Sequence, residues 1–229
     1  YISAVSTQGP ILTDNGGSVL LYKTTGFEIG DEVSVSGTIT SFNCGFQIGT
    51  AGLTIEKTGT TTVTYPTAVE LTGAKMDELL TTRTTDEYAQ FVKIVGTVAV
   101  SGNYYNFNVD GATTAVGSFY GLTDEQKAVL VDGEKTTIYG YFVSISKSGG
   151  VPKYINFITT HINETPAVAN NYTSVLGTAV LNDAVEVKGY ISAVSTQGPI
   201  LTDNTGSIIV YKAADLGLAV GDEVTVNGP

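Results

Sequence analysis

The side chains best suited to bind a ligand lie in the segment 104–109, Tyr-Tyr-Asn-Phe-Asn-Val. Alternation along a β-strand separates it into two faces. The apolar face, which we expect to point inward, carries Tyr105, Phe107 and Val109. The opposite face carries an aromatic ring for stacking and two amides for hydrogen bonding. We therefore predict Tyr104, Asn106 and Asn108 as ligand-binding residues, with an ordinary solvated or interdomain face as the alternative.

Residues for catalysis are scarce. His161 is the only histidine, and it ends the strand-like run Phe-Ile-Thr-Thr-His, where a structural or surface position is expected. A Ser-His pair would have to use it, yet the segment 117–120, Gly-Ser-Phe-Tyr, lacks the G-x-S-x-G pattern of a nucleophile elbow. No P-loop, H-E-x-x-H or dinucleotide-binding glycine pattern occurs. The sequence predicts that the chain is not an enzyme.

The sequence also predicts no metal or other cofactor. Cys44 is the only cysteine, which excludes an intrachain disulfide and a Cys-based metal site; we expect it to be buried in a strand over 42–48. The paired carboxylates have structural explanations in turns, strand entrances and the start of a helix. A calcium site at Asp14 and Asn15 remains an alternative, although the spacing is not that of an EF-hand loop.

The charge balance disfavours nucleic acid as a partner. Twenty-two acidic residues outnumber eleven basic ones, giving a net charge of −11, and the basic residues are dispersed, with Arg83 the only arginine. Affinity for phosphates normally needs clustered cations. A neutral glycan is compatible with this surface. No apolar run approaches the ~20 residues of a membrane span.

A long internal repeat organises the chain. The fifteen residues Tyr1 to Asn15, YISAVSTQGPILTDN, return unchanged as Tyr190 to Asn204, and the GDEV at Gly30 returns at Gly221. Self-similarity at a fixed spacing is the signature of a repeat array. The segment before Tyr190, Val-Glu-Val-Lys-Gly, has no counterpart before Tyr1, so we expect residues 1–229 to be a section of a longer protein.

Strand patterns in the first part of the chain match the order of elements in an OB-fold, a small five-stranded Greek-key barrel. A turn signal, Asn15-Gly16, separates the second and third of these strands. The predicted strands are 1–6, 10–14, 19–22, 33–39 and 42–48. Residues 54–65 are strand-like as well, and Met76, Leu79 and Leu80 have helical spacing within 74–81.

The middle of the chain has different residues but the same spacing of glycines. Glycines seven residues apart bracket a similar strand three times, at Gly30–Gly37, Gly133–Gly140 and Gly221–Gly228. The other strands predicted for this part are 91–100, 104–109, 116–120 and 154–161. A helix is predicted over 124–130, where Thr123 and Gln126 are spaced as a capping box. A helix between the third and fourth strands is expected of an OB-fold.

These patterns predict an all-β array of tandem OB-fold barrels joined by short helices. We place one barrel and its connector at 1–86, a second barrel at 87–166, and a connector with a third, incomplete unit at 167–229. The first unit lacks its opening half-strand and the third lacks its last strand. Unpaired strand edges are sites for pairing with another chain, so other copies or neighbouring repeats are the expected partners.

The pattern GYISAVSTQGPILTDNTGSIIVYK followed by VGDEVTVNG resembles tandem OB-fold modules of bacterial extracellular and cell-surface proteins, including modules attached to secreted nucleases. The shared points are Gly189 in the first strand, LTD in the second, GS before an apolar strand with Tyr, and GDEV with a glycine seven residues later. In the middle unit GDEV is replaced by GEKT. The resemblance implies the fold and an extracellular or cell-surface location more than it implies a ligand.

We therefore expect a non-catalytic extracellular structural repeat protein, a stalk, fibre or adhesin segment. The repeat, the incomplete terminal units and the lack of reactive clusters motivate this expectation. The alternative is an OB-fold module that binds single-stranded nucleic acid or oligosaccharide, in which exposed aromatic rings would stack on the ligand. Such a module could be an accessory domain of a secreted enzyme.

Overall fold

The computed structural model describes residues 1–164, 166, 185–202, 207–211 and 217–228. The chain divides into two compact units, Tyr1–Val168 (unit 1) and Ala169–Pro229 (unit 2). The described elements are mostly β-strands, as the all-β prediction requires. The predicted segments 1–86 and 87–166 both lie within unit 1. The connector predicted after residue 166 lies outside the described residues as far as residue 184.

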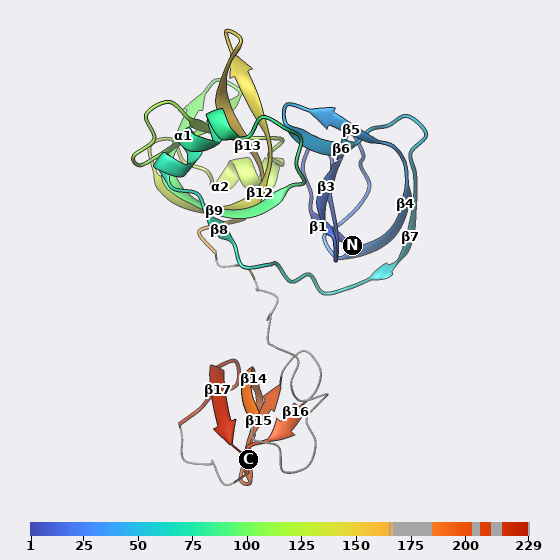
Figure 1. The fold of residues 1–229 in the computed structure, drawn as a ribbon, viewed down its shortest axis with the longest axis vertical. Coiled ribbons are helices and arrows are strands. Elements are labelled where there is room, and N and C mark those ends of the chain that lie inside the picture. Colours follow the sequence, from blue (N-terminus) through green and yellow to red (C-terminus); the bar gives the residue numbers. More distant parts are fainter. Residues whose placement is uncertain (165, 167–184, 203–206, 212–216, 229) are drawn as a thin grey trace. The chain divides into compact units, whose positions relative to one another are not determined.

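Unit 1 contains a closed five-stranded barrel (Figure 1). Its strands are β9 (Gln90–Ser101), β10 (Tyr104–Val109), β11 (Val116–Phe119), β12 (Lys135–Ser148) and β13 (Val151–Ile162). Around the barrel the order is β9-β10-β11-β13-β12 and back to β9. β11 and β13 are parallel, and the other pairs are antiparallel. All five strands predicted for this part of the chain are present, but β12 continues past Gly140 to Ser148 and β13 begins at Val151.

Alternating apolar residues fill the barrel. Phe107 and Phe157 are fully buried, and both rings pack edge-on against Phe119, with centroids 5.7 and 5.1 Å away. Such aromatic contacts add to the stabilisation that comes from burying apolar area. The predicted inward face of β10 is confirmed, because Phe107 and Val109 are buried and Tyr105 packs against this core.

Two short helices accompany the barrel. The helix α2 (Asp124–Val129) follows β11 and begins with the predicted capping box, in which the Thr123 side chain accepts from the Gln126 N–H and the Gln126 side chain accepts from the Thr123 N–H. The helix α1 (Gly73–Thr82) is confirmed within two residues of its predicted bounds and buries Met76 in the barrel core. No helix in the described part of the chain is long and apolar enough to cross a membrane.

Asp77 of α1 holds the loop that joins β10 to β11. Its carboxylate accepts hydrogen bonds from the N–H groups of Thr113, Thr114 and Ala115 and from the Thr113 hydroxyl, at 2.7–2.9 Å. These bonds favour the ionised form and lower the pKa of Asp77 far below its ordinary value, with the Ala115 N–H making the largest contribution. One side chain therefore fixes the geometry of a whole loop.

The first part of unit 1 forms an open sheet. Its strands are β1 (Ile2–Ala4), β2 (Ile11–Asp14), β3 (Gly17–Leu21), β5 (Ile39–Phe42) and β6 (Gly45–Ile48), in the order β1-β2-β3-β6-β5. A separate pair is formed by β4 (Asp31–Ser36) and β7 (Thr54–Thr60). A short strand, β8 (Val69–Glu70), pairs in parallel with the first half of β9.

The prediction of a single strand over 42–48, with Cys44 in its core face, is wrong. Asn43 and Cys44 have φ angles of 52° and 63°, which make a tight turn between β5 and β6. Cys44 is only half-buried. The alternation of Phe42, Phe46 and Ile48 is typical of a continuous strand and led to the wrong prediction. Asn43 indicated a turn, because asparagine tolerates positive φ, but this signal was weaker than the alternation.

The open sheet packs on the outer surface of the barrel (Figure 1). Ala4, Ile11 and Leu20 of the sheet share a core with barrel side chains that point outward. These outward side chains are Phe91, Tyr141, Val143 and Ile158. Tyr65 closes the core by stacking on Phe91, with ring centroids 4.8 Å apart, and its hydroxyl donates to the Ser3 carbonyl at 2.8 Å.

The turn between β5 and β6 fixes this packing. A Cβ atom on Gly45 would overlap the Val143 carbonyl oxygen, so only glycine fits there. The Ile145 N–H donates to the Asn43 carbonyl at 2.8 Å. Arg83 is 5% exposed; its Nε donates to the Cys44 carbonyl at 2.9 Å, and its guanidinium lies 4.2 Å from the Phe142 ring centroid. Arg83, the only arginine, thus has a structural role where the β5–β6 turn meets β12, a contact that we call the joint between the first sheet and the barrel.

Unit 2 repeats the start of unit 1. Its strands are β14 (Val185–Ser195), β15 (Gly198–Thr202), β16 (Ser207–Ile209) and β17 (Glu223–Gly228), in the order β16-β15-β14-β17. The Ile2↔Leu12 and Ala4↔Ile11 pairs of β1 and β2 return as Ile191↔Leu201 and Ala193↔Ile200, with the same register shift. The end of the repeat, 203–204, lies outside the described residues.

One set of hydroxyl groups occurs in two environments. In unit 1, Thr13 lies 2.7 Å from the Ser3 hydroxyl and 2.8 Å from the Ser18 hydroxyl, and all three are buried beneath the barrel. In unit 2, Thr202 keeps the same contacts to Ser192 and Ser207, at 2.7 and 2.8 Å, but both serines are exposed. The local hydrogen bonds are the same, while the surroundings differ.

This difference predicts unequal effects of the same substitution. Thr13→Val removes the hydroxyl that pairs with the buried Ser18 hydroxyl and leaves Ser3 only its 3.4 Å bond to the Ile11 carbonyl, so it should lower the free energy of unfolding of unit 1 by about 1–3 kcal/mol. Thr202→Val, the matched control, should change unit 2 by less than about 0.5 kcal/mol, because water replaces the lost partner. Denaturation followed by NMR signals of each unit measures both values. Equal losses would contradict the role assigned to burial.

Asp77→Asn should lower the thermal unfolding midpoint of unit 1 at neutral pH by several degrees, because an amide replaces an acceptor-only carboxylate. The folded-state pKa of Asp77 lies below its unfolded value, so its contribution is present above pH 4 and is lost as pH falls. The difference between wild type and variant should therefore shrink below pH 4. Glu78→Gln, which alters only an exposed ion pair with Lys75, is the control. A pH-independent difference would contradict this interpretation.

Candidate functional site

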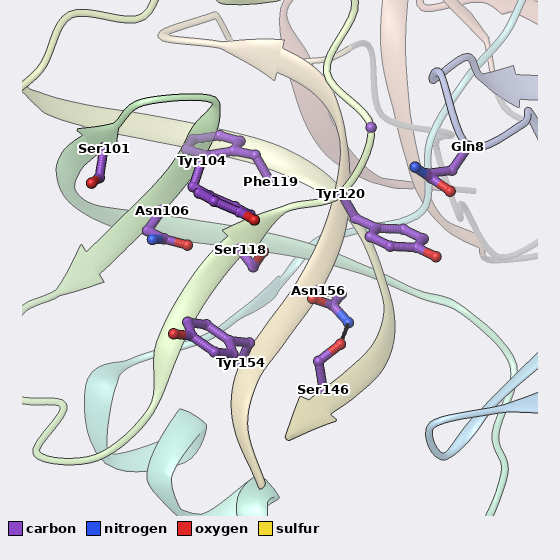
Figure 2. A pocket seen from close by; sticks show the side chains of 11 residues that line it. Gln8, Ser101, Tyr104, Asn106, Ser118, Phe119, Tyr120, Ser146, Tyr154 and Asn156 are labelled. Atoms are coloured by element: carbon purple, nitrogen blue, oxygen red, sulfur yellow. Dashed lines mark hydrogen bonds between the residues drawn. The ribbon is translucent and has the colours of Figure 1, made fainter. Parts of the chain in front are cut away.

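An open groove of about 590 Å³ lies on the face of the barrel formed by β10, β11 and β13 (Figure 2). Its lining is polar and aromatic, with Tyr104 at one side and Tyr120 toward the other. The lining residues are Gln8, Ser101, Tyr104, Asn106, Ser118, Phe119, Tyr120, Gly121, Ser146, Tyr154 and Asn156. Concave sites with a few placed polar groups are where proteins bind small ligands.

Two of the three predicted ligand-binding residues lie in this groove. Tyr104 and Asn106 both line it, and the Tyr104 side chain is 75% exposed, so its ring is accessible. Asn108 is exposed two residues further along β10 and is not among the lining residues. Of the three predicted ligand-binding residues, only the first two therefore line the groove.

Asn106 is the first residue of a row of polar side chains that crosses neighbouring strands of the barrel. Asn106 is opposite Ser118, and Ser118 is opposite Asn156. The next strand adds Ser146, whose hydroxyl accepts a 2.6 Å hydrogen bond from Asn156 Nδ2. The hydroxyl proton of Ser146 remains available to a ligand, because a serine oxygen that accepts can still donate. The groove thus offers donors and acceptors along a line.

Asn156 is the most buried member of this row, with 2% of its surface exposed. Its Nδ2 also donates to the Ser144 hydroxyl at 2.9 Å. Two hydrogen bonds from one amide nitrogen hold the side chain in a single orientation and compensate its desolvation. Asn156 therefore fixes the floor of the groove before any ligand arrives.

Three tyrosines supply flat surfaces beside the polar row, namely Tyr104, Tyr120 and Tyr154 (Figure 2). Tyr120 stacks on Phe42, with centroids 6.4 Å apart and ring planes at 23°. Burial raises the pKa of Tyr120, and the nearby Tyr22 raises it further, so its hydroxyl stays protonated at neutral pH. These rings give apolar faces and neutral hydrogen-bonding groups together.

The groove carries no charged side chain among its lining residues. Two lysines lie nearby. Lys127 lines an adjoining cavity of about 260 Å³ and pairs with Asp124 at 2.8 Å, and the Lys153 ammonium lies 5.6 Å from the Tyr154 ring centroid. Neither makes the clustered positive potential that a phosphate backbone requires.

Most of the lining was missed from the sequence. Tyr154 and Asn156 alternate with buried Ile155 and Phe157, so a polar face on this strand was visible, but its proximity to Asn106 depends on the parallel pairing of β11 and β13. Gln8 had no signal. It reaches the groove because the loop after β1 bonds to the barrel, with the Thr7 N–H donating to the Gly121 carbonyl at 2.8 Å.

The other residues considered for chemistry lie elsewhere. The His161 ring packs edge-on against Tyr65, 5.3 Å between centroids, and burial lowers its pKa. Asp14 Oδ1 accepts from the N–H groups of Gly16 and Gly17 at 2.7 and 3.1 Å, which is a turn-forming role. Within the described ranges no group of three or more His, Cys, Asp or Glu side chains is arranged to hold a metal ion. The groove is thus equipped for binding through neutral contacts.

Comparison with known proteins gives no further assignment. No protein-family model, curated protein sequence or solved structure matches this chain.

Proposed function

We propose that unit 1 is a non-catalytic module that binds neutral oligosaccharides in the groove on β10, β11 and β13. The observation that carries this proposal is the uncharged lining, in which Tyr104 presents its ring beside the polar row of Asn106, Ser118 and Asn156. Sugar rings have apolar C–H faces that pack on aromatic rings, and hydroxyls that pair with amides and serines.

We further propose that the barrel is an OB-fold. Its strands follow the order one, two, three, five, four and back to one, and α2 stands between the third and the fourth. OB-folds bind oligosaccharides and single-stranded nucleic acids on the face centred on strands two and three. β10 and β11 are those strands here, and they form one side of the groove.

The charges favour a glycan over nucleic acid. The chain carries a net charge of −11, and repulsion of phosphates extends about 8 Å at physiological salt. A neutral oligosaccharide avoids this repulsion. An extracellular or cell-surface location agrees with such a ligand and with the resemblance to exported bacterial modules.

The first test is a titration of the full chain with a panel of neutral oligosaccharides and with single-stranded DNA, each at two salt concentrations, by calorimetry. We expect oligosaccharide binding that is insensitive to salt. Tyr104→Ala should weaken it about tenfold, equivalent to about 1.4 kcal/mol, because the stacking face is lost. Tyr104→Phe should keep most of the affinity.

Asn108→Ala is the matched control, because Asn108 is exposed on the same strand but outside the groove. It should leave the affinity unchanged. Binding of DNA with a steep salt dependence would replace the glycan by nucleic acid as the ligand. Failure of every ligand in the panel to bind would contradict a binding function for this groove.

A second candidate, a structural array, rests on a different observation. Fifteen identical residues recur, and the described part of the second copy pairs in the same register as the first. We propose that units of this kind succeed one another in a stalk, fibre or adhesin, with stability arising from each unit and its neighbour interface.

Electron microscopy of the native material tests the array. The expected images are elongated particles with a regular longitudinal repeat. Discrete compact particles without such a repeat would contradict the array, while leaving the glycan titration unaffected.

A further inference from the structure

The strand β4 has one paired edge and one unpaired edge. It pairs antiparallel with β7, from Asp31↔Thr60 to Ser36↔Thr54. Among the described residues, no strand pairs with its other edge. Unpaired backbone groups on a strand edge are ready to accept a further strand.

The two strands equivalent to β4 show what belongs at this edge. β12 pairs with β13 on one side and with β9 on the other, from Lys135↔Thr97 to Phe142↔Gln90. β17 pairs with the first half of β14, from Val185↔Gly228 to Tyr190↔Glu223. In both cases the partner is the first half of the strand that opens the barrel (β9) or the unit 2 sheet (β14).

The same hydrogen bond marks the start of this edge in all three places. The Gly133 N–H donates to the Val98 carbonyl at 2.9 Å, and the Gly221 N–H donates to the Ile191 carbonyl at 2.8 Å. In the first sheet the Gly30 N–H donates to the Ile2 carbonyl at 2.9 Å. The pairing therefore begins at Gly30 as it does elsewhere, and β4 then continues without a partner on that side.

The direction of the backbone groups follows from these bonds. The Ile191 N–H donates to the Asp222 carbonyl at 2.9 Å, so Asp222, the counterpart of Asp31, faces the first strand of its unit. On the other side, the Thr61 N–H donates to the Gly30 carbonyl at 2.7 Å. Successive residues of a strand direct their N–H and C=O groups to opposite edges. The backbone groups of Val33 and Val35, two and four residues after Asp31, therefore point to the unpaired edge of β4.

We propose that this edge of β4 accepts a strand with the sequence Val185–Gly189, the opening half-strand of the repeat. The acceptor sequences are nearly the same, Asp-Glu-Val-Ser-Val-Ser at 31–36 and Asp-Glu-Val-Thr-Val-Asn at 222–227. In unit 2, Val187 is 2% exposed in a core with Ile191 and Leu201. Ile2 and Leu12 occupy the corresponding positions in unit 1.

The occupied edge adds β4 and β7 to the strand that opens the first sheet, through main-chain hydrogen bonds like those between β14 and β17. Strand addition of this kind gives affinity through the backbone and specificity through alternate side chains. Here the alternate residues are Val185, Val187 and Gly189, of which Gly189 is constrained: a Cβ atom on it would overlap the Thr202 carbonyl oxygen. Thr13 is the counterpart of Thr202, so a strand added to unit 1 should also carry glycine opposite this carbonyl.

The test is a full chain extended by Val-Glu-Val-Lys-Gly directly before Tyr1, which is in register because Gly189 precedes Tyr190. We expect hydrogen exchange at the Val33 and Val35 amides to slow at least tenfold and the unfolding midpoint of unit 1 to rise. The control extension, Val-Glu-Pro-Lys-Gly, has a proline that cannot donate a hydrogen bond at the position of Val187, and should give neither effect.

Size-exclusion chromatography of the same samples identifies the source of the strand. Protection in a monomer shows that the extension pairs within its own chain, and protection in a dimer shows donation to a second copy; both support the acceptor. Identical exchange at Val33 and Val35 in the two extended chains would overturn the proposal. The glycan titration does not depend on this result, since the groove lies on the barrel.

Discussion

The packing of the first sheet on the outside of the barrel is the constraint on which unit 1 depends. The joint leaves no room at Gly45, and the buried Arg83 bonds to the Cys44 carbonyl while lying on Phe142. A buried guanidinium is costly unless its donors are used. Because this joint is held by main-chain contacts and one buried cation as well as by apolar area, the sheet and the barrel keep a fixed geometry, and the loop carrying Gln8 stays beside Gly121.

The groove inherits its shape from that joint and from the barrel. Three strands bring Asn106, Ser118 and Asn156 into line. Hydrogen bonds to two serines hold the buried Asn156 side chain in one orientation. A binding site prepared in this way loses little conformational entropy when a ligand arrives. The lining residues carry no charge and the whole chain is acidic, and for these two reasons we propose a neutral ligand rather than one with phosphate groups.

Local patterns predicted much of this structure, and contacts distant in sequence account for the rest. Alternation in 104–109 identified the inward face of β10, and Thr123 with Gln126 identified the start of α2, because both signals act over a few residues. The turn at Asn43 and Cys44 was hidden by apolar residues on both sides. The sequence placed Tyr104 and Asn106 in the site but not Gln8 or Asn156, whose positions depend on strand pairing and sheet packing. The repeat shows the same limit, since identical serines are buried in unit 1 and exposed in unit 2.

The central claim is that a groove made by three strands and one loop of unit 1 binds a neutral glycan. Backbone amide chemical shifts, recorded by NMR during titration with an oligosaccharide that binds, test it most directly. We expect the changes to concentrate at Gln8, 104–106, 118–121 and 154–156, while the signals of 185–202 in unit 2 stay in place. Changes centred on unit 2, or on strands of unit 1 away from this groove, would contradict the account.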